Sequence, residues 1–541
     1  MPKSTDRTTR ASGTVASIGY ASGPLFLIDA AEATAYTPSG DPVAEANRLR
    51  AALARAAIDL AELMARSDAD SAAILEFQVA MIEDDSLSEP AFAAIASGTD
   101  AASAWSDALA TEVHGYETAE DAYFAARSSD LRDIAARVLR ALTGVRDAEP
   151  PAGAIIHGRD LTPTQFLATD WREGGGIVLK QGSAASHVAM LARSRGVPML
   201  VGIGEFDSNA GDLILVDAER GRIIVLPDTE DRHEFLKAST AHRHLLQDAR
   251  SHLREPAVTA DGVRIEVLVN IAEPTDVEHI DIATCDGVGL MRTEFLFGKS
   301  LPDEDTQYAA YRKVLNWAHG KPVTIRTVDA GGDKPVPGYT VEETNPFLGL
   351  RGIRLSLTRP EILRVQVRAL LRAAVHGELK VMFPMVSVVH EYTAAAALFT
   401  EQSQSLGAAG ISHAMPRLGI MVEVPAVAIA PEPFRDVAFF SIGSNDLTQY
   451  VMAAGRDNGA VAALNDVRNP AVLTLIRQVA RFGEQHGIPV SLCGDAGGDP
   501  SAIPSLLAAG LRALSVTPAQ LPLAKAAIAR ARTTDTVDGQ S

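Results

Sequence analysis

The chain has 541 residues, of which 47% are hydrophobic and 22% are charged, and this composition excludes a mostly disordered protein. Because domains usually contain about 100–150 residues, we expect two to four folded units. The formal net charge of −19 disfavours nucleic acid and anionic membrane surfaces as partners.

The sequence also lacks the usual signals of membrane insertion and of secretion. No apolar run reaches the roughly 18–20 residues that span a bilayer, and the polar N-terminal segment has no signal-peptide core. The two cysteines, Cys285 and Cys493, lie far apart, which excludes a disulfide scaffold and a Cys-rich zinc site. We therefore expect a soluble, cytoplasmic protein.

In the first half of the chain, a helical segment interrupts a β-rich one. A short β-like run, 13–28, precedes an Ala-rich helical stretch that ends near residue 144, and β-type runs return between 153 and 226. The pattern predicts an α/β domain over 1–40 and 146–228, with a helical bundle over 41–145 inserted into it. A helical pattern at 235–254 predicts a linker helix within residues 229–260.

From residue 261 to the C-terminus, short apolar runs alternate with helical patterns. Eight runs are strand candidates: RIEVLVN, GVGLMRTEF, PVTIRTVD, LKVMFPM, RLGIMVEVP, DVAFFSIGSND, PVSLCGD and RALSVT. Eight βα units over about 280 residues predict a TIM (β/α)8 barrel, so the fold class is α/β. Most of the runs end in polar or charged residues, which is where a barrel places its active site.

Charged and polar residues gather after these strand candidates. The set comprises Arg292, Glu294, Arg326, Asp329, Lys334, Glu423, Asn445, Asp446, Arg456 and Cys493, with Arg351 in the segment before the fourth strand. Several arginines indicate a phosphorylated, carboxylated substrate, and the pair Glu423 and Asp446 suits Mg²⁺. Each charge alone could form an internal ion pair or a solvated helix end, and Cys493 alone could be a core residue.

A second candidate site lies in the segment KQGSAASHVAMLARSRGVPMLVG. Ser186 is a plausible N-cap, which places His187 in the first turn of a helix, where free N–H groups and the helix dipole favour an anion. A phosphoryl group on the imidazole would be stabilised there, and histidine can act as a covalent nucleophile. A capping or structural histidine remains the alternative.

Together these motifs identify a resemblance that spans about residues 13–530. The chain resembles Enzyme I of the bacterial phosphotransferase system, the phosphoenolpyruvate-protein phosphotransferases. The stretches that carry the resemblance are GVGLMRTEFLF, RTVDAGGDK, NPFLGLRGIR, FPMVS, IMVEVPA, FFSIGSNDLTQY and CGDAGGD. The helical insertion, with EFQVAMIEDDSL and SSDLRDIAARVLRALTG, is similar to the subdomain that binds the histidine-containing carrier HPr.

The resemblance implies a role for each candidate residue. His187 becomes the phosphorylated residue, Cys493 the acid that protonates the enolate, and Glu423 and Asp446 the ligands of Mg²⁺. The phosphoenolpyruvate ligands become Arg292, Arg326, Arg351, Asn445 and Arg456, with Lys334 assisting. A free-standing HPr-type carrier and a homodimer through the barrel are also implied, in a sugar-uptake or regulatory phosphorelay.

The chain departs from the family pattern at a few positions near His187 and Cys493. Ala185 replaces the usual threonine of the histidine loop, and Phe166 stands where a hydroxyl residue is usual. Gln78 and Ala80 occupy positions where larger or titratable carrier contacts are common, and Asp495 replaces a glutamate. These changes bear on the transfer rate and on the identity of the carrier.

Two other functions fit parts of the pattern. A pyruvate-phosphate dikinase or phosphoenolpyruvate synthase shares both modules, but it needs a large nucleotide-binding domain for which 541 residues leave no room. A non-catalytic regulator could keep the fold, but the complete set of arginines, acids, Cys493 and His187 argues against lost chemistry.

Overall fold

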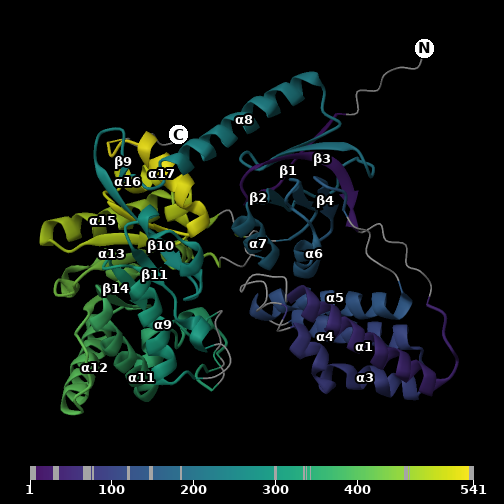
Figure 1. Cartoon of the computed structure of the whole chain (residues 1–541), viewed down its shortest axis with the longest axis horizontal. Coiled ribbons are helices and arrows are strands. Elements are labelled where there is room, and N and C mark those ends of the chain that lie inside the picture. The colour runs from purple at the N-terminus through teal and green to yellow at the C-terminus, as the bar shows by residue number, and fades with distance from the viewer. Residues whose placement is uncertain are drawn as a thin grey trace. The chain divides into compact units, whose positions relative to one another are not determined.

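The computed structural model describes residues 8–28, 36–64, 75, 78–118, 122–144, 150–182, 186–297, 301–332, 336, 338–341, 343–455, 461 and 464–534. They belong to two compact units, 1–242 and 243–541 (Figure 1). Lys334, Arg456 and the side chain of His187 lie outside the described part of the chain. No helix within the described ranges is both long and apolar enough to cross a membrane.

The first unit contains an eight-stranded sheet with the order β1-β8-β7-β3-β4-β5-β6-β2. Strands β3, β4, β5 and β6 pair in parallel with one another in that order, and the remaining pairs are antiparallel. Ile155 and Ile156 are neighbours in β4 and belong to different apolar clusters, because side chains alternate across a strand. The strands are β1 Thr9–Ser12, β2 Thr14–Ser17, β3 Tyr20–Leu27, β4 Ile155–Gly158, β5 Gly176–Leu179, β6 Met199–Val201, β7 Leu213–Asp217 and β8 Arg222–Val225.

Helices inserted between β3 and β4 form a bundle with its own core. That core includes the fully buried Leu49, Trp105 and Leu131. Its helices are α1 Pro42–Met64, α3 Asp85–Ala96, α4 Ala101–Thr118 and α5 Ala122–Thr143. Two short helices, α6 Pro163–Ala168 and α7 His187–Arg195, contribute to an apolar cluster with the sheet. The helix predicted as a linker is α8 Thr229–Ser251, while the domain boundaries themselves stay a prediction.

The second unit is a closed parallel barrel, which confirms the predicted TIM barrel. Each strand pairs with the next along the chain, and the sheet closes because β10 pairs with both β11 and β17. The eight predicted strands are all present: β10 Arg264–Ile271, β11 Val288–Met291, β12 Val323–Arg326, β13 Leu379–Phe383, β14 Arg417–Val422, β15 Phe440–Gly443, β16 Val490–Cys493 and β17 Ala513–Val516. A two-residue strand, β9 Ala257–Val258, adds to β10 in antiparallel fashion.

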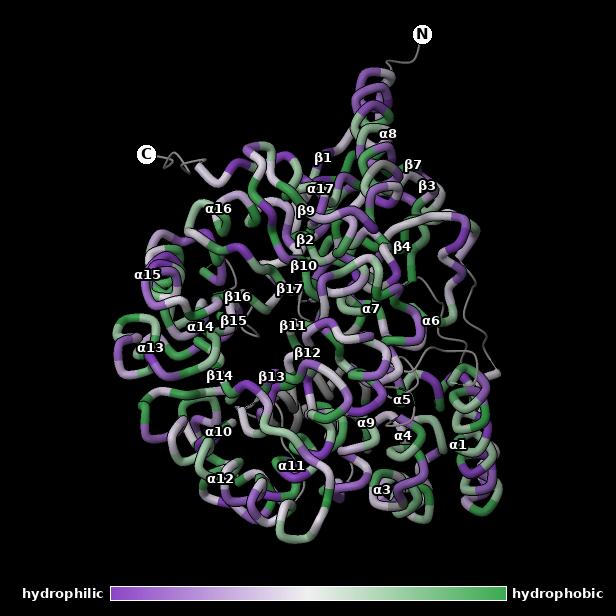
Figure 2. The backbone as a smooth tube through the Cα atoms, turned by 60° about the vertical axis from the view of Figure 1, so that its left-hand side comes forward, coloured by the Kyte–Doolittle hydropathy of each residue, from purple (hydrophilic) through white to green (hydrophobic). Residues whose placement is uncertain are grey.

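Helices that connect the strands surround the barrel and cover the outward faces of its strands. Helices α11 and α15 each bury one face, and Figure 2 shows green and purple alternating along such helices, as expected for amphipathic segments. The helices are α9 Glu304–Trp317, α10 Ile353–Thr358, α11 Pro360–Ala373, α12 Val389–Ala408, α13 Pro425–Ile429, α14 Ser444–Met452, α15 Pro470–His486, α16 Ile503–Ala508 and α17 Leu521–Arg530.

Candidate active site

The carboxyl ends of the barrel strands bring the predicted charged residues together. Arg326 and Cys493 are the last residues of β12 and β16, and Glu423 directly follows β14. Asp446 lies in the first turn of α14, which begins where β15 ends. The end of the barrel that carries active sites in this fold therefore holds these side chains, as the sequence predicted.

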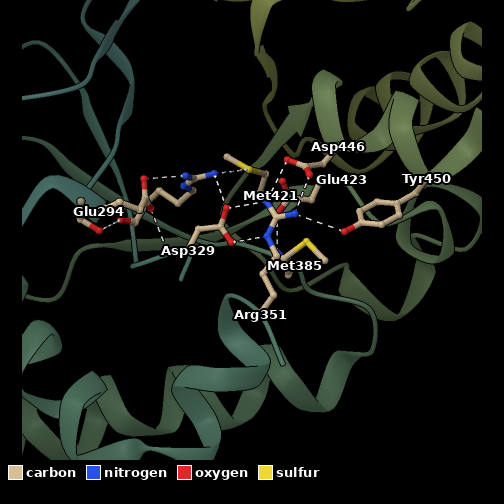
Figure 3. Close-up of polar contacts among 10 residues, drawn as sticks. Glu294, Asp329, Arg351, Met385, Met421, Glu423, Asp446 and Tyr450 are labelled. Atoms are coloured by element: carbon tan, nitrogen blue, oxygen red, sulfur yellow. Dashed lines mark hydrogen bonds and ion pairs between the residues drawn. The ribbon is translucent and has the colours of Figure 1, made fainter. Parts of the chain in front are cut away.

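Arg351 is fully buried and lies between two carboxylates (Figure 3). Its Nε and Nη2 donate to the two oxygens of Asp329 at 3.1 and 2.9 Å, and its Nη1 donates to Asp446 Oδ1 at 2.9 Å. Burial alone would lower the pKa of Arg351, but the charges of Asp329 and Asp446 outweigh it and raise the pKa. The guanidinium is therefore a permanent buried positive charge.

Arg326 forms a second buried pair next to the first. Its Nη2 donates to Glu294 Oε2 at 3.0 Å, and its Nη1 lies 3.3 Å from Asp329 Oδ2. The other oxygen of Glu294 accepts the N–H of Asp329 at 2.9 Å. Asp329 is thus shared between two guanidiniums, so the two arginines are held at a fixed separation.

Glu423 is a carboxylate of this network whose hydrogen bonds are incomplete among the described residues. It is fully buried, and its Oε1 accepts the N–H of Met385 at 2.6 Å. Its Oε2 is buried without a hydrogen-bond partner among the described residues. Burial and the nearby charges of Asp446 and Asp329 raise the pKa of Glu423 to about 8. A buried carboxylate oxygen that no described residue contacts through a hydrogen bond favours an added cation.

The surroundings of Glu423 fit a divalent metal ion. A Cβ added to Gly443 would lie 3.0 Å from Glu423 Oε2, so the glycine keeps space open beside the unpartnered oxygen. No three metal-ligating side chains converge anywhere in the described part of the chain. A cation held by Glu423 and Asp446 would thus take its other ligands from substrate and water, as Mg²⁺ commonly does.

Cys493 lies inside the barrel, where it is 2% exposed and packs against Met382 and Met421. The hydroxyl of Ser441 donates to its sulfur at 3.2 Å. Burial raises the pKa of the Cys493 thiol to about 11, although the bond from Ser441 and the charge of Arg326 act in the opposite sense. The thiol is therefore protonated at neutral pH and can serve as a proton donor.

Two further predicted residues lie at the edge of this buried network. Arg292 directly follows β11 and is exposed, so its guanidinium is accessible to a ligand. Asn445 is held by Asp495: its Nδ2 donates to Asp495 Oδ2 at 3.2 Å, and its Oδ1 accepts the Asp495 N–H at 3.1 Å. The aspartate at the position of a family glutamate thus orients the amide.

The site also contains two residues, Tyr450 and Met385, that were not predicted from sequence. The hydroxyl of Tyr450 donates to the carbonyl of Phe347 at 2.6 Å and lies 3.4 Å from Arg351 Nη1. Met385 has a φ of 57°, a strained value for a residue with a side chain, and its N–H is the one that Glu423 accepts. Tyr450 lies one turn after Asp446, which is a usable sequence signal, whereas none exists for Met385.

The second predicted site lies in the first unit, at the start of α7. Ser186 is the N-cap, and its hydroxyl accepts the N–H of Ala189 at 3.2 Å, which confirms the predicted cap. His187 is the first residue of the helix, at the end that favours anions. Nearby, Phe166 is fully buried, with its ring 5.1 Å from the ring of Trp171.

Comparisons with known proteins cover almost the whole chain. Three family models match: "PEP-utilising enzyme, N-terminal" over residues 12–127, "PEP-utilising enzyme, mobile domain" over 150–221, and "PEP-utilising enzyme, PEP-binding domain" over 247–533. A phosphoenolpyruvate-protein phosphotransferase of Geobacillus stearothermophilus is 37% identical over 536 residues, 95% of this chain and 93% of the relative. Proteins with the same name from Bacillus sp. (strain S) and Priestia megaterium are 36% and 35% identical, each over 95% of this chain and 92% and 93% of their own length.

Proposed function

Because the chain belongs to the phosphoenolpyruvate-protein phosphotransferase family, we propose that it catalyses phosphoenolpyruvate-dependent phosphorylation of its own His187 and then of an HPr-type carrier. The site observation that supports this activity is that buried guanidiniums lie at the same end of the barrel as Glu423, a carboxylate whose Oε2 has no hydrogen-bond partner among the described residues. Such a site combines phosphate-binding groups with room for a cation.

The arginines have distinct parts in substrate binding. Arg292 is exposed and free to meet the phosphoryl or carboxylate group directly. Arg326 and Arg351 are held in place by Asp329, so little side-chain entropy remains to be lost when a phosphoryl oxygen contacts them. Asn445 assists, and Lys334 and Arg456 belong to the proposed set by family resemblance.

Glu423 and Asp446 would hold the metal, which we propose to be Mg²⁺. A bound divalent ion screens the negative charge of the phosphoryl group and the enolate. Glu423 Oε2, which has no hydrogen-bond partner among the described residues, and the space beside Gly443 support this assignment.

The residues of the chain divide the reaction into two chemical steps. A nitrogen of the His187 ring attacks phosphorus, an N–P bond forms, and the bond from phosphorus to the enol oxygen breaks. The electron pair stays on the enolate, whose carbon takes the proton of the Cys493 thiol to give pyruvate. The phosphoryl group then passes to the histidine of the carrier, for which the helical bundle is the proposed docking surface.

Assembly, location and pathway follow as further proposals. We expect a homodimer through the barrel and a cytoplasmic location, in the first step of a sugar-uptake or regulatory phosphorelay. Light scattering at micromolar concentration with phosphoenolpyruvate and Mg²⁺ present tests the dimer, and a particle with the mass of one chain would contradict it.

Mass spectrometry tests the proposed activity directly. The intact protein should gain the mass of one phosphoryl group after incubation with phosphoenolpyruvate and Mg²⁺, without added nucleotide. The same treatment of a His187→Ala variant should leave the mass unchanged. An unmodified wild-type protein, or a nucleotide requirement, would overturn the proposal.

A further inference from the structure

Gln366 is a buried polar residue on a helix that otherwise buries apolar side chains. It lies on α11, whose other buried residues are aliphatic, and its side chain is fully buried. Helix α11 packs against α9 on the outer layer of the barrel (Figure 1). An amide buried among apolar groups is costly unless its hydrogen bonds are made, so its partners reveal why it is there.

The amide of Gln366 connects three partners. Its Oε1 accepts the backbone N–H of Val328 at 3.0 Å. Its Nε2 lies 3.3 Å from Thr293 Oγ1 and 3.1 Å from the hydroxyl oxygen of Tyr311. Two of these partners, Thr293 and Val328, lie just beyond the carboxyl ends of β11 and β12.

The hydrogen-bond donors and acceptors around Gln366 allow only one orientation of its amide group. The hydroxyl of Thr293 donates to the carbonyl of Arg326 at 3.0 Å, and that of Tyr311 donates to Gln307 Oε1 at 3.0 Å. Both hydroxyl oxygens therefore need a donor, which is the Gln366 NH2 group, while the Val328 N–H needs its carbonyl. A flipped amide would place the NH2 group of Gln366 against the N–H of Val328, and both are donors. The side chain therefore has one orientation.

The residues bonded by Gln366 alternate along the chain with residues of the site. Thr293 stands between Arg292 and Glu294, and Val328 directly precedes Asp329. Arg326, whose carbonyl accepts from Thr293, is itself a site residue. A shift of one strand end relative to the other would change the distance between Glu294, just beyond β11, and its partner Arg326 at the end of β12.

We propose that Gln366 is a positioning residue for the phosphoenolpyruvate site, which holds the ends of β11 and β12 at the separation that the arginines require. The inference rests on the proposed function, because it concerns the geometry of the same site. Gln366 acts from behind the strands and touches no substrate. Its effect is transmitted through the backbone of residues 293 and 326–328.

The test compares Gln366→Leu with Tyr311→Phe in the full-length protein. Leucine fills a similar volume but leaves the Val328 N–H and Thr293 Oγ1 without their partner. Phenylalanine removes one bond of the same amide on the side away from the site. We expect Gln366→Leu to lower kcat/KM for phosphoenolpyruvate by about tenfold or more, with a raised KM, and Tyr311→Phe to stay within about threefold of wild type.

A second readout separates positioning from general destabilisation. Transfer of a phosphoryl group from phosphorylated carrier back to His187 does not use the barrel site, so Gln366→Leu should leave its rate unchanged. Thermal unfolding of both variants shows whether they lose similar stability. If Gln366→Leu fails to fold, the kinetics of Thr293→Val and Thr293→Ser are compared instead. Valine lacks the bridging hydroxyl of Thr293, and serine keeps it.

Three results would overturn the inference. The first is wild-type kinetics in Gln366→Leu. The second is an equal loss of kcat/KM in Gln366→Leu and Tyr311→Phe. Where the threonine pair is used, the third is an equal loss of kcat/KM in Thr293→Val and Thr293→Ser. A wild-type protein that leaves His187 unphosphorylated overturns the proposed function and this inference with it. Equal effects in the paired variants, with an active wild type, overturn this inference alone.

Discussion

Arg351 donates to Asp446 at 2.9 Å, so one of the two proposed metal ligands already has a buried positive partner. The other, Glu423, has none on its Oε2 within the described part of the chain. The two acids therefore differ in what they do for the fold, although both serve the same proposed metal ion.

This difference predicts opposite effects of two conservative substitutions on stability. In the metal-free protein, Asp446→Asn should lower the free energy of unfolding by about 1–3 kcal/mol, because a buried charged hydrogen bond to Arg351 is weakened. Glu423→Gln should leave it unchanged or raise it, because the buried carboxyl group, whose Oε2 has no hydrogen-bond partner among the described residues, is replaced by a neutral amide. Urea titrations of the two variants beside wild type measure both.

Both variants should nevertheless fail to phosphorylate His187, because each replaces an anionic oxygen ligand of the metal with a neutral amide. Near-normal phosphorylation in either variant would contradict the metal assignment. Equal destabilisation by both would contradict the account in which Arg351 is a partner of Asp446 but not of Glu423.

Gly443 offers a test of the metal site that leaves every ligand in place. A Cβ at this position would lie 3.0 Å from Glu423 Oε2 and 3.1 Å from its Cβ, so Gly443→Ala should narrow the space for a cation. We expect Mg²⁺ binding, measured by calorimetry, to weaken by about tenfold or more, with little change in thermal stability. Gly419→Ala is unsuitable as a control, because its Cβ would meet the Phe439 backbone at 2.5 Å. Gly407→Ala, where an added Cβ would meet only His413 Cε1 at 3.6 Å, shows the effect of an added methyl group away from the site, and binding equal to that variant would contradict the prediction.

Much of this arrangement could be predicted from the sequence, because a barrel places the carboxyl ends of its strands next to one another. Glu423 and Cys493 follow apolar runs, and parallel strands that close on themselves bring such positions to one end. The pairing of Arg351 with Asp446 could not be predicted, since it depends on side-chain directions across 95 residues of sequence. The role of Gln366 could not be predicted either, because a single glutamine in a helix does not indicate which strand ends it will contact.

In the helical bundle, a buried carboxylate predicts a pH dependence of stability. Glu45 accepts hydrogen bonds from the hydroxyl of Tyr36 at 2.7 Å, from the N–H and hydroxyl of Ser39 at 2.7 and 2.6 Å, and from the N–H of Ala101 at 2.8 Å. Burial alone would raise the pKa of Glu45, but these bonds lower it from 4.5 to about 2. The ionised form is thus favoured by folding.

The sign of the effect follows from this lowered pKa. Glu45 contributes its full stabilisation above about pH 4.5, the unfolded value, and loses it as the pH falls towards 2. Glu45→Gln should therefore lower the unfolding temperature at pH 7, with a difference from wild type that shrinks as the pH is lowered. A difference that stays constant from pH 7 to the acid limit of folding would contradict the prediction.

The two proposed chemical residues can be separated by two further variants. His187→Ala should abolish phosphoryl transfer while phosphoenolpyruvate binding at the barrel, measured by calorimetry, is kept. Cys493→Ala should still phosphorylate His187, though slowly, because the thiol acts only after phosphoryl transfer. It should fail to convert the enolate promptly into pyruvate with a defined configuration at C3.

Cys285→Ala is the matched control, because Cys285 is also free and buried but lies before β11, away from the site residues. With a C3-labelled substrate in deuterated water, wild type and Cys285→Ala should protonate one face of the enolate, and Cys493→Ala should protonate both. The pKa of about 11 keeps the Cys493 thiol protonated throughout the neutral range, so the stereochemical outcome should not change between pH 6 and 8. If Cys493→Ala protonates the same single face as wild type, Cys493 is a packing residue of the barrel interior and the proton comes from another group.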